Sequence, residues 1–361
     1  MANGCDKYMM HWSSERNYNI IGVFTYIMKI IPYIILTTLL PIGLQVMGQQ
    51  EELNLYPVTE NVYVINGAGC NVVFQVTEDG ILVVDAGEKP SMTEQVLLLI
   101  KEVSGQPIRY LILTHYHHTV GADEFPQTTI MIAQTNTRSN IPLYRKTLSE
   151  LMGKDILKLS KNLENVRPGN NSERDNIIKQ IETRKKQLDG IKQQKDILPQ
   201  ITFDANIKIH LGVQSAEILY LGPGHTNGDV IIHFPEEKVL CVGDLIYTNG
   251  WIPRLDGDAG SSVDNWIKIF EHITEMDVNK IIPGHGKVIG KEEFIRTSKT
   301  ASEYLTDLKA EVKKYVDQKH SLEYIKANLR LPKYQEMGMS EVLLPWNIEG
   351  AYNEVIKYKV K

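Results

Sequence analysis

Short apolar runs separated by turn residues dominate the chain from Asn61 to Gly290. The runs NVYVING, CNVVFQV and ILVVDAG are typical of strands, and the turn EDG between the last two predicts a hairpin. The segment SMTEQVLLLIKEVSG has helical spacing, with Ser91 as its expected N-cap. The run IRYLILT, from Ile108 to Thr114, is mostly apolar and predicts a buried strand.

The pattern changes in the middle of the chain and then returns to strands. Leu143 to Leu198 is charged and helical in period, and the turn NVRPGNNSE predicts that it forms a hairpin of two helices over the strands. This insertion is either a solvated structural segment or a lid or substrate wall. The first alternative is favoured, because a charged helical face is usually just solvated.

Further strands follow in the runs ITFDANIKIHLG, AEILYLG, DVIIHFP and KVLCVGDLI. The helical segment SSVDNWIKIFEHITEM comes next, with Ser262 or Ser261 as its cap, and from Lys291 onward the tail is helical and amphipathic. Strands thus precede helices in two rounds, which predicts an α/β sandwich of two sheets with helices outside. We divide the chain into an extension at 1–48, a domain at 49–290 with the helical insertion 143–198, and a helical segment at 291–361.

The N-terminal extension contains an uncharged apolar stretch at residues 30–44, preceded by Met28-Lys29. A basic start, an apolar core of about 7–15 residues and small residues before a cut are typical of a secretory signal peptide, with cleavage expected before Gln49. This interpretation is simplest if translation begins at Met28. The alternative is an uncleaved membrane anchor, because from Ile20 to Met47 only Lys29 is charged. We therefore expect a periplasmic or secreted protein, or a membrane-anchored one if the segment is retained.

Composition narrows the class of partner. The chain has 361 residues, 42% hydrophobic and 23% charged, with a net charge of −5, which is ordinary for a globular protein and argues against nucleic acid as a partner. Its three cysteines do not make a disulfide framework. If the signal peptide is removed, Cys70 and Cys241 remain, and they either pair or stay buried. We expect a small-molecule substrate, no nucleic acid, and a membrane only if the N-terminal segment is uncleaved.

Three histidines stand close together in THYHHTVGAD, directly after the predicted strand 108–114. His115 and His117 are two residues apart, so on an extended chain their side chains point the same way and can share one metal ion. Taken alone, this pair is weak support for a metal site.

Three later sequence blocks strengthen the prediction of a metal site. GPGHTNGD contains His225, VGDLI contains Asp244 and IIPGHG contains His285, and each block follows an apolar strand beside a glycine. Any one of these histidines alone is best interpreted as a hydrogen-bonded loop residue. Together they predict a metal site at one edge of the sheets, with Zn²⁺ as the expected ion and Mn or Fe as possible substitutes.

These four blocks, in this order, resemble the metallo-β-lactamase superfamily over roughly Leu55 to Gly290. The resemblance implies an αββα sandwich with one or two metals, usually zinc, at the rim between the sheets. It implies that His115, His117 and His225 hold the first metal. It also implies that Asp244 bridges two metals and that His285 holds the second.

The chain departs from the family pattern in the opening block, where T-H-x-H-x-D-H is expected and T-H-Y-H-H-T-V stands instead. Depending on the alignment, His118 replaces the family's aspartate or serves as its third histidine, and Thr119 replaces one of the two. The second metal then lacks a ligand, with His118, Asp244 and His285 as its candidates. We expect either a single tightly bound Zn²⁺ or a tightly bound Zn²⁺ together with a second ion that is held more weakly.

The resemblance implies a metal-dependent hydrolase in which metal-bound water attacks an ester, thioester, amide or related bond. No catalytic residue beyond the metal ligands is assigned. The alternatives are a β-lactam-hydrolysing enzyme and a non-catalytic relative that binds a metal or ligand. Tyr247, Asn249 and Trp251 follow Asp244 and could line the pocket, although buried aromatic side chains more often serve packing.

Overall fold

The computed structural model describes residues 52–193 and 197–359. The predicted signal peptide, its alternative as a membrane anchor and the cleavage position all lie outside the described residues. Among the helices of the described segments, none is both long enough and apolar enough to cross a bilayer.

The first sheet contains, in the described part of the chain, seven strands in sequence order. They are β1 (Asn54–Pro57), β2 (Val62–Asn66), β3 (Val72–Thr77), β4 (Gly80–Val84), β5 (Ile108–Ile112), β6 (Ile130–Gln134) and β7 (Ile201–Phe203). β1 to β4 pair antiparallel, including the predicted hairpin in which Thr77 lies opposite Gly80. β4 to β7 run parallel, so the carboxyl ends of β4 and β5 lie at the same edge of the sheet.

The second sheet has six strands within the same described residues, in the order β13-β12-β11-β10-β9-β8. They are β8 (Asn206–Leu211), β9 (Gln214–Leu219), β10 (Ile231–Phe234), β11 (Val239–Tyr247), β12 (Lys280–His285) and β13 (Ile289–Gly290). Only β11 and β12 pair parallel among these neighbours, so the later parts of both strands, which carry Asp244 and His285, lie side by side.

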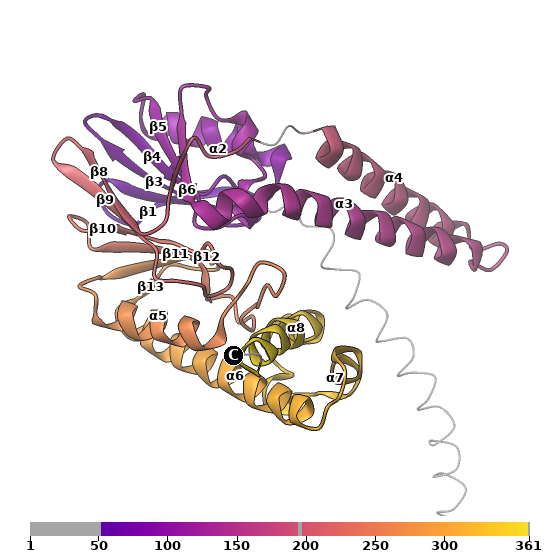
Figure 1. Ribbon diagram of the computed structural model, residues 1–361. Helices are drawn as coiled ribbons and strands as arrows, with labels where there is room; N and C mark the ends of the chain where they lie inside the picture. Colours follow the sequence, from indigo (N-terminus) through magenta and orange to yellow (C-terminus); the bar gives the residue numbers. More distant parts are fainter. Residues whose placement is uncertain (1–51, 194–196, 360–361) are drawn as a thin grey trace, which may run out of the picture. The chain divides into compact units, whose positions relative to one another are not determined.

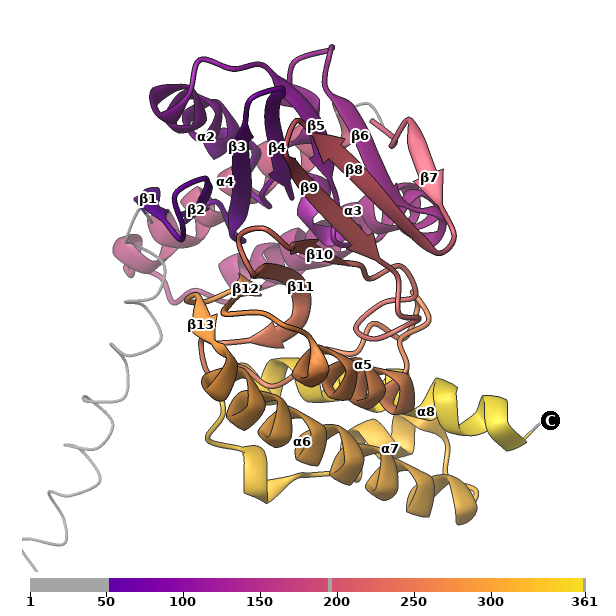
Figure 2. The same ribbon diagram turned by 90° about the vertical axis from the view of Figure 1, so that its left-hand side faces the viewer.

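Helices cover the outer faces of both sheets (Figures 1 and 2). The α-helices are α2 (Pro90–Val103), α3 (Thr135–Glu164), α4 (Asn171–Gln193), α5 (Val263–Glu275), α6 (Lys291–Asp317), α7 (Leu322–Asn328) and α8 (Ser340–Lys359). Short 3-10 turns occur at η2 (His117–Thr119), η3 (Ala122–Glu124) and η4 (Pro332–Tyr334). Together with the two sheets, this arrangement confirms the predicted α/β class and αββα sandwich.

Three apolar layers hold the sandwich together. Between the sheets, Val64, Val84 and Ile112 pack with Ile232 and Phe234. On the outer face of the first sheet, Val96 and Ile100 of α2 pack on that sheet, and α5, α6 and α8 share a core with the second sheet. Burial of apolar area at roughly 25 cal/mol per Å² makes these layers the main stabilising contribution to the fold.

The structure corrects two local predictions. Ser91 is not the cap of α2; Lys89 is, because Pro90 occupies the first helical position, where its fixed φ fits and its missing N–H costs nothing. The two-helix hairpin and its turn are confirmed, but the first helix begins at Thr135, well before Leu143. The Gln134 side chain accepts a hydrogen bond from the Asn136 backbone and so starts α3 directly after β6. Ser262 is confirmed as the cap of α5.

Candidate metal centre

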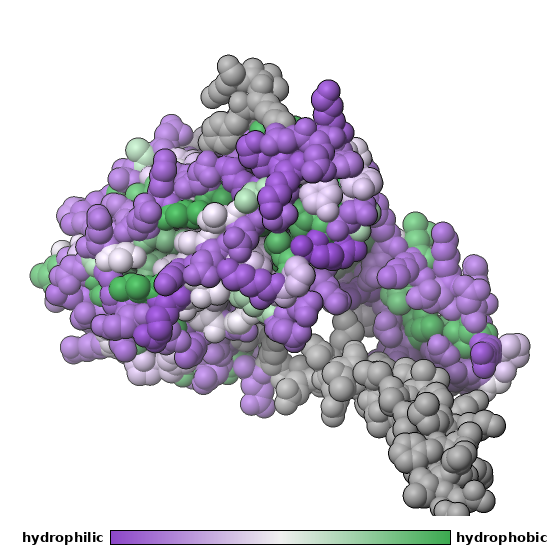
Figure 3. All heavy atoms as spheres, turned by 90° about the horizontal axis from the view of Figure 1, so that it is seen from below, coloured by the Kyte–Doolittle hydropathy of each residue, from purple (hydrophilic) through white to green (hydrophobic). Residues whose placement is uncertain are grey.

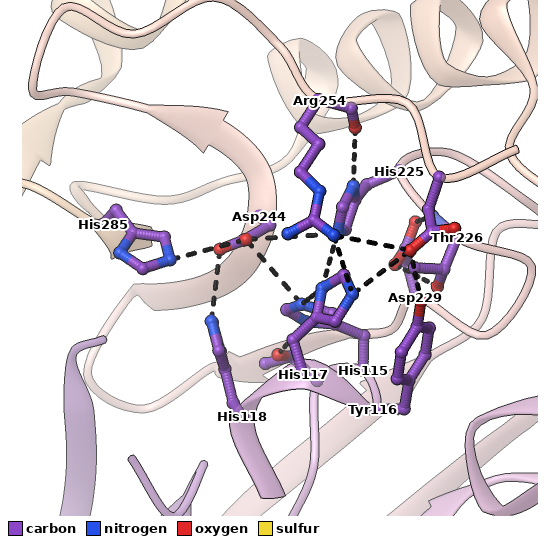
Figure 4. A network of polar contacts seen from close by, with 12 residues as sticks. His115, Tyr116, His117, His118, His225, Thr226, Asp229, Asp244, Arg254 and His285 are labelled. Atoms are coloured by element: carbon purple, nitrogen blue, oxygen red, sulfur yellow. Dashed lines mark hydrogen bonds and ion pairs between the residues drawn. The ribbon is translucent and has the colours of Figure 1, made fainter. Parts of the chain in front are cut away.

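All six sequence-predicted site residues meet at one edge of the two sheets (Figure 4). Three come from the segment after β5, one from the loop between β9 and β10, and two from β11 and β12. These residues are His115, His117, His118, His225, Asp244 and His285. The two sheets are joined beside them, because the Asn71 amide N–H donates to the Gly284 carbonyl at 2.7 Å and the Asn71 side chain donates to the Pro283 carbonyl at 2.8 Å.

The first group consists of His115, His117, His225 and Asp244, all of them buried. Nδ1 of His117 lies 3.1 Å from Nε2 of His115 and 3.0 Å from Nε2 of His225. Oδ2 of Asp244 lies 3.7 Å from Nε2 of His115 and 4.0 Å from Nε2 of His225. Four potential donor atoms therefore converge on one point.

The opposite nitrogen of each of these three histidines faces an oxygen atom. His225 Nδ1 lies 2.6 Å from the Arg254 carbonyl, which can only accept, so this nitrogen carries the proton. His117 Nε2 lies 3.2 Å from the Asp256 carboxylate. For His115 the partner is the Thr114 hydroxyl at 3.0 Å, whose own hydrogen is donated to Asp85 at 2.8 Å.

These oxygen atoms fix the tautomers of the three histidines, so that the lone pairs of their inner nitrogens gather at one place. With each outer nitrogen protonated, the inner nitrogens of His115, His117 and His225 present only lone pairs to one another. The His117 Nδ1 lone pair lies 3.0–3.1 Å from those of His115 and His225, and such lone pairs repel unless a cation lies between them. Nitrogens bound tetrahedrally to zinc at about 2.0–2.1 Å lie about 3.3 Å apart, so the residues fit a metal ion.

Burial supports the same protonation states. It lowers the pKa of His225 to about 4 and the pKa values of His115 and His117 well below their usual range. Burial opposes the ionisation of Asp244, but the neighbouring His285 and His118 hold the pKa of that carboxyl well below its usual range. In the first group, the neutral imidazoles of His115, His117 and His225 beside an ionised Asp244 are the protonation states that metal binding requires.

A second group, Glu88, His118 and His285, lies on the other side of Asp244. His118 Nδ1 donates to the Asp85 carboxylate at 2.9 Å, which turns Nε2 toward Asp244 Oδ1 at 3.4 Å and Glu88 Oε1 at 3.8 Å. His285 Nε2 lies 3.5 Å from Asp244 Oδ2. Within the described residues, His118 Nε2 and Asp244 Oδ1 are buried and have no hydrogen-bond partner. Such orphaned atoms call for an explanation, and a second cation between them supplies one.

Asp244 lies between the two groups. Its Oδ2 accepts from the Tyr247 hydroxyl at 3.0 Å and lies near both His115 and His285, whereas Oδ1 faces His118. Gly284 allows this approach, since a Cβ there would lie 2.2 Å from Asp244 Oδ1 and 2.7 Å from His118 Cε1. Asp244 thus lies between the two groups, and its bridging of two metals stays a prediction of the resemblance.

The other residues that the sequence singled out differ in whether they contact the site. Tyr247 contacts the site, and its ring stacks on His285 at 5.9 Å, with Trp251 5.5 Å from the same ring. Thr119 instead donates to the Tyr116 carbonyl at 2.9 Å and serves the local turn. Cys70 and Cys241 are free and buried, and burial raises the pKa of the Cys70 thiol to about 12.

Sequence reasoning missed Glu88, Asp85, Arg254 and Asp256. Asp85 and Glu88 follow β4 directly, at the edge where β5 delivers the histidines, and this shared edge was the available signal. Arg254 is the only charged residue between Asp244 and Asp256 in the sequence. Its Nη2 lies 3.4 Å from His117 Nε2 and 3.7 Å from the Asp256 carboxylate, which also accepts a hydrogen bond from Tyr116.

Comparison with protein families supports this site. The model of the metallo-beta-lactamase superfamily matches residues 65–135 and 158–285, more than half of the chain. The matched segments contain every residue of both groups. They leave out residues 136–157 of α3 and everything after 285.

Two kinds of relative share sequence with the chain. The acyl-coenzyme A thioesterase MBLAC2 of Bos taurus is 26% identical over 117 residues, which cover 30% of this chain and 38% of that protein. The chain thus matches little more than a third of the length of that relative. A metallo-beta-lactamase type 2 of Elizabethkingia meningoseptica is 24% identical over 282 residues, covering 74% of this chain and 93% of that protein.

Among solved structures, the stereoselective inverting sec-alkylsulfatase Pisa1 from Pseudomonas sp. is similar with a TM-score of 0.58. Its sequence is 14% identical, and the match covers 84% of this chain and 50% of that chain. At this identity the similarity concerns the fold alone.

Proposed function

The chain belongs to the metallo-β-lactamase superfamily, and from this membership we propose that it is a metal-dependent hydrolase of an ester, thioester, amide or related bond. The observation that carries the proposal is the convergence of three imidazole lone pairs and the Asp244 carboxylate at one buried point. A non-catalytic binding module would need the same ligands, so the proposal is decided by activity and not by metal content alone.

We propose that His115, His117, His225 and Asp244 hold the first metal, and that zinc is this metal because nitrogen and carboxylate donors suit it. When bound, such an ion lowers the pKa of coordinated water from 15.7 to about 7 and polarises a carbonyl oxygen. The residues around the ligands keep the donor atoms in place. Asp85 acts through Thr114, Asp256 acts on His117, and the Arg254 carbonyl acts on His225.

Arg254 is our candidate for binding the negative charge that develops on the substrate. Its guanidinium lies beside His117 (Figure 4). Its Nη2 is also 3.7 Å from the Asp256 carboxylate, and its Nε is buried with no hydrogen-bond partner within the described residues. A preorganised donor aimed at a developing oxyanion is a large contribution to catalysis in hydrolases. The Tyr144 ring, 4.8 Å from the His117 ring, helps to exclude water from the same side.

For the second metal we propose Glu88, His118 and His285, with Asp244 Oδ1 as the shared ligand. Glu88 supplies the carboxylate that the opening sequence block lacks. The second site then lacks fewer ligands than the sequence alone predicts. Its ligands are nevertheless more exposed than those of the first site, so we expect it to bind its metal more weakly.

The two kinds of relative favour different substrates. The thioesterase relatives support an ester or thioester substrate, but they match only a third of their length. The type 2 metallo-beta-lactamase matches most of both chains, which keeps β-lactam hydrolysis as the second candidate. We rank the ester or thioester first because Asp244 and the GPGHTNGD block resemble the broad hydrolase branch of the family.

The decisive experiment combines zinc content with a screen of an ester, a thioester and a cephalosporin, each repeated with His225→Ala. We expect metal-dependent turnover of at least one substrate in the wild type and its loss in the variant. Turnover that His225→Ala leaves unchanged would refute the proposal. So would full zinc occupancy without turnover of any of the three substrates, which would favour the binding module.

We also propose that the protein is secreted or periplasmic after cleavage before Gln49. N-terminal sequencing of the native protein tests this, and a mature end at Ala2 or Asn3 contradicts it.

A further inference from the structure

A cavity of about 300 Å³ lies between α3 and α8, beside the metal centre. Its apolar walls come from Leu143, Leu148 and Leu151 of α3 and from Val342, Leu343 and Trp346 of α8. Both walls lie in segments that the superfamily model leaves unmatched, namely 136–157 and the chain after 285. Both apolar walls therefore lie outside the part of the chain that the superfamily model matches.

Several of these apolar side chains face solvent although a charged surface would be expected there. Leu143 is 62% exposed, Val342 58%, Leu151 38% and Trp346 36%. Figure 3 shows exposed hydrophobic side chains on the projecting hairpin of α3 and α4 and on the neighbouring body of the molecule. Exposed apolar side chains gathered around one cavity mark a binding surface more often than a chance arrangement.

The inner end of the cavity reaches the metal centre. Tyr116, Tyr144, Arg254 and Asp256 line it, and each of them contacts His117. Helix α8 also fixes the loop that carries Arg254, since the buried Asn347 accepts from the Leu255 N–H at 2.7 Å and donates to the Pro253 carbonyl at 2.7 Å. Substrate bound along α8 would thus end beside Arg254.

Charge is distributed along the cavity in a way that fits one class of ligand. Arg254, which lies 5.6 Å from the Trp346 ring, is the cation at the inner end. Asp256 is engaged by His117 and Tyr116, and Asp258 is exposed at the margin. Between the cation and the margin the walls are mostly hydrocarbon. A flexible aliphatic chain with a carbonyl or carboxylate at one end matches this order.

We propose that the cavity between α3 and α8 binds the aliphatic acyl chain of the substrate, with its carbonyl end at Arg254 and the metal centre. This inference rests on the proposed hydrolase function and narrows its substrate to acyl esters or thioesters. At about 30 Å³ for each water-sized group, the cavity holds a chain of roughly eight to ten carbon atoms.

The first test measures binding without turnover. Isothermal titration calorimetry with the zinc-loaded full chain compares butyrate, hexanoate, octanoate and decanoate. We expect the Kd to fall about three- to fourfold for each added methylene until the cavity is filled. An affinity that does not change with chain length would overturn the proposal.

Variants locate the binding. Leu143→Glu and Val342→Glu place a charge on opposite walls at exposed positions, and each is expected to weaken decanoate binding about tenfold or more. Leu157→Glu is the matched control, because Leu157 is 64% exposed on the same helix and does not line the cavity. Equal losses in all three variants would contradict the assignment.

The second test uses p-nitrophenyl esters from acetate to decanoate. The wall variants should lower kcat/KM for decanoate at least tenfold and leave acetate within about twofold. Hydrolysis with no chain-length preference would reject the acyl cavity and leave the hydrolase function standing. Chain-length-dependent binding without hydrolysis of any ester would reject the hydrolase function and leave the cavity assigned. If decanoate does not bind and the wall variants instead dissociate a dimer in sedimentation experiments, the surface covers a second copy and the proposal is wrong.

Discussion

The two groups of the candidate metal centre share Asp244 but differ in how they are built. In the first group the side chains are 0–4% exposed, whereas in the second Glu88 is 29% and His285 12% exposed. Each histidine of the first group has an oxygen atom on its outer nitrogen. In the second group, the structure shows such a partner for His118, while His285 is placed by ring stacking on Tyr247 and by Asp244.

The difference indicates unequal preorganisation. A donor whose tautomer and orientation are fixed before the metal arrives gives a tighter and more selective site. Solvent at the second group can replace a protein ligand at modest cost, so that group tolerates more change. We expect the metal of the first group to be tightly held and essential for activity, and the metal of the second group to exchange readily. The following predictions test this difference between the two groups.

The largest effect should come from emptying the first group. His117→Ala removes the nitrogen nearest to both other imidazoles and is expected to lower kcat/KM by at least about a thousandfold, or about 4 kcal/mol. Metal analysis of the purified variant should show loss of the metal that survives dialysis in the wild type. Retention of that tightly held metal together with normal activity would mean that the first group is not the essential one.

Asp256→Asn tests the oxygen partners of the first group without touching a ligand. We expect about ten- to a hundredfold weaker affinity for the tightly held metal, because His117 loses the carboxylate that fixes its tautomer. Competition with a chelator measures the affinity. Asp258→Asn is the matched control, since Asp258 is exposed two positions along the same loop. If both substitutions lowered the metal affinity equally, the proposed role of Asp256 in fixing the His117 tautomer would be wrong.

Glu88→Gln should affect only the exchangeable metal. Because Glu88 is partly exposed and water can take its place, we expect about a tenfold loss of affinity for the second metal and no change in the first. Titration of the chelator-treated protein with zinc, followed by calorimetry, resolves the two steps. Glu94→Gln on the exposed face of α2 is the control. A change in the first binding step alone would reverse the assignment of the two groups.

The smallest effect concerns pH and the metal-free protein. The pKa of His225 falls from 6.5 in the unfolded chain to about 4 in the folded one, so the unfolded state binds a proton at the higher pH. Stability is therefore fully present above about 6.5 and decreases as the pH falls toward about 4. We expect the Tm of metal-free protein to drop by several degrees between pH 7.5 and pH 5, measured by calorimetry. The Tm of His225→Ala should change less over the same range, and an equal drop would exclude His225 as the cause.

The unequal groups also show what a sequence can and cannot reveal. Asp244 and His285 stand within apolar strands, and His115, His117 and His225 stand in the loops that follow such strands, at one shared edge of the sheets. Strand periodicity was therefore enough to assemble them, and with them the α/β layering. His118 could be placed near the site but not given an orientation, which depends on its bond to Asp85.

Arg254 and Asp256 were not predictable for a different reason. They lie in a long loop without periodicity, and the position of that loop depends on Asn347 of α8, about 90 residues later in the sequence. Glu88 is set by the turn that precedes α2, where Pro90 and not Ser91 determines the helix start. Tertiary contacts of this kind leave no local pattern.

The connection between β6 and β7 has a consequence for how this protein can diversify. The two strands are parallel neighbours, with Ile132 opposite Ile201, so the chain must return along the sheet and needs a crossover between them. Helix α3 provides that crossover, and the rest of the α3–α4 hairpin is part of the same connection between β6 and β7. Its outer turns can be lengthened, shortened or exchanged without shifting the register of any strand. Grafting the hairpin of one relative onto the sheets of another is thus a route to new ligand preferences with the metal chemistry left intact.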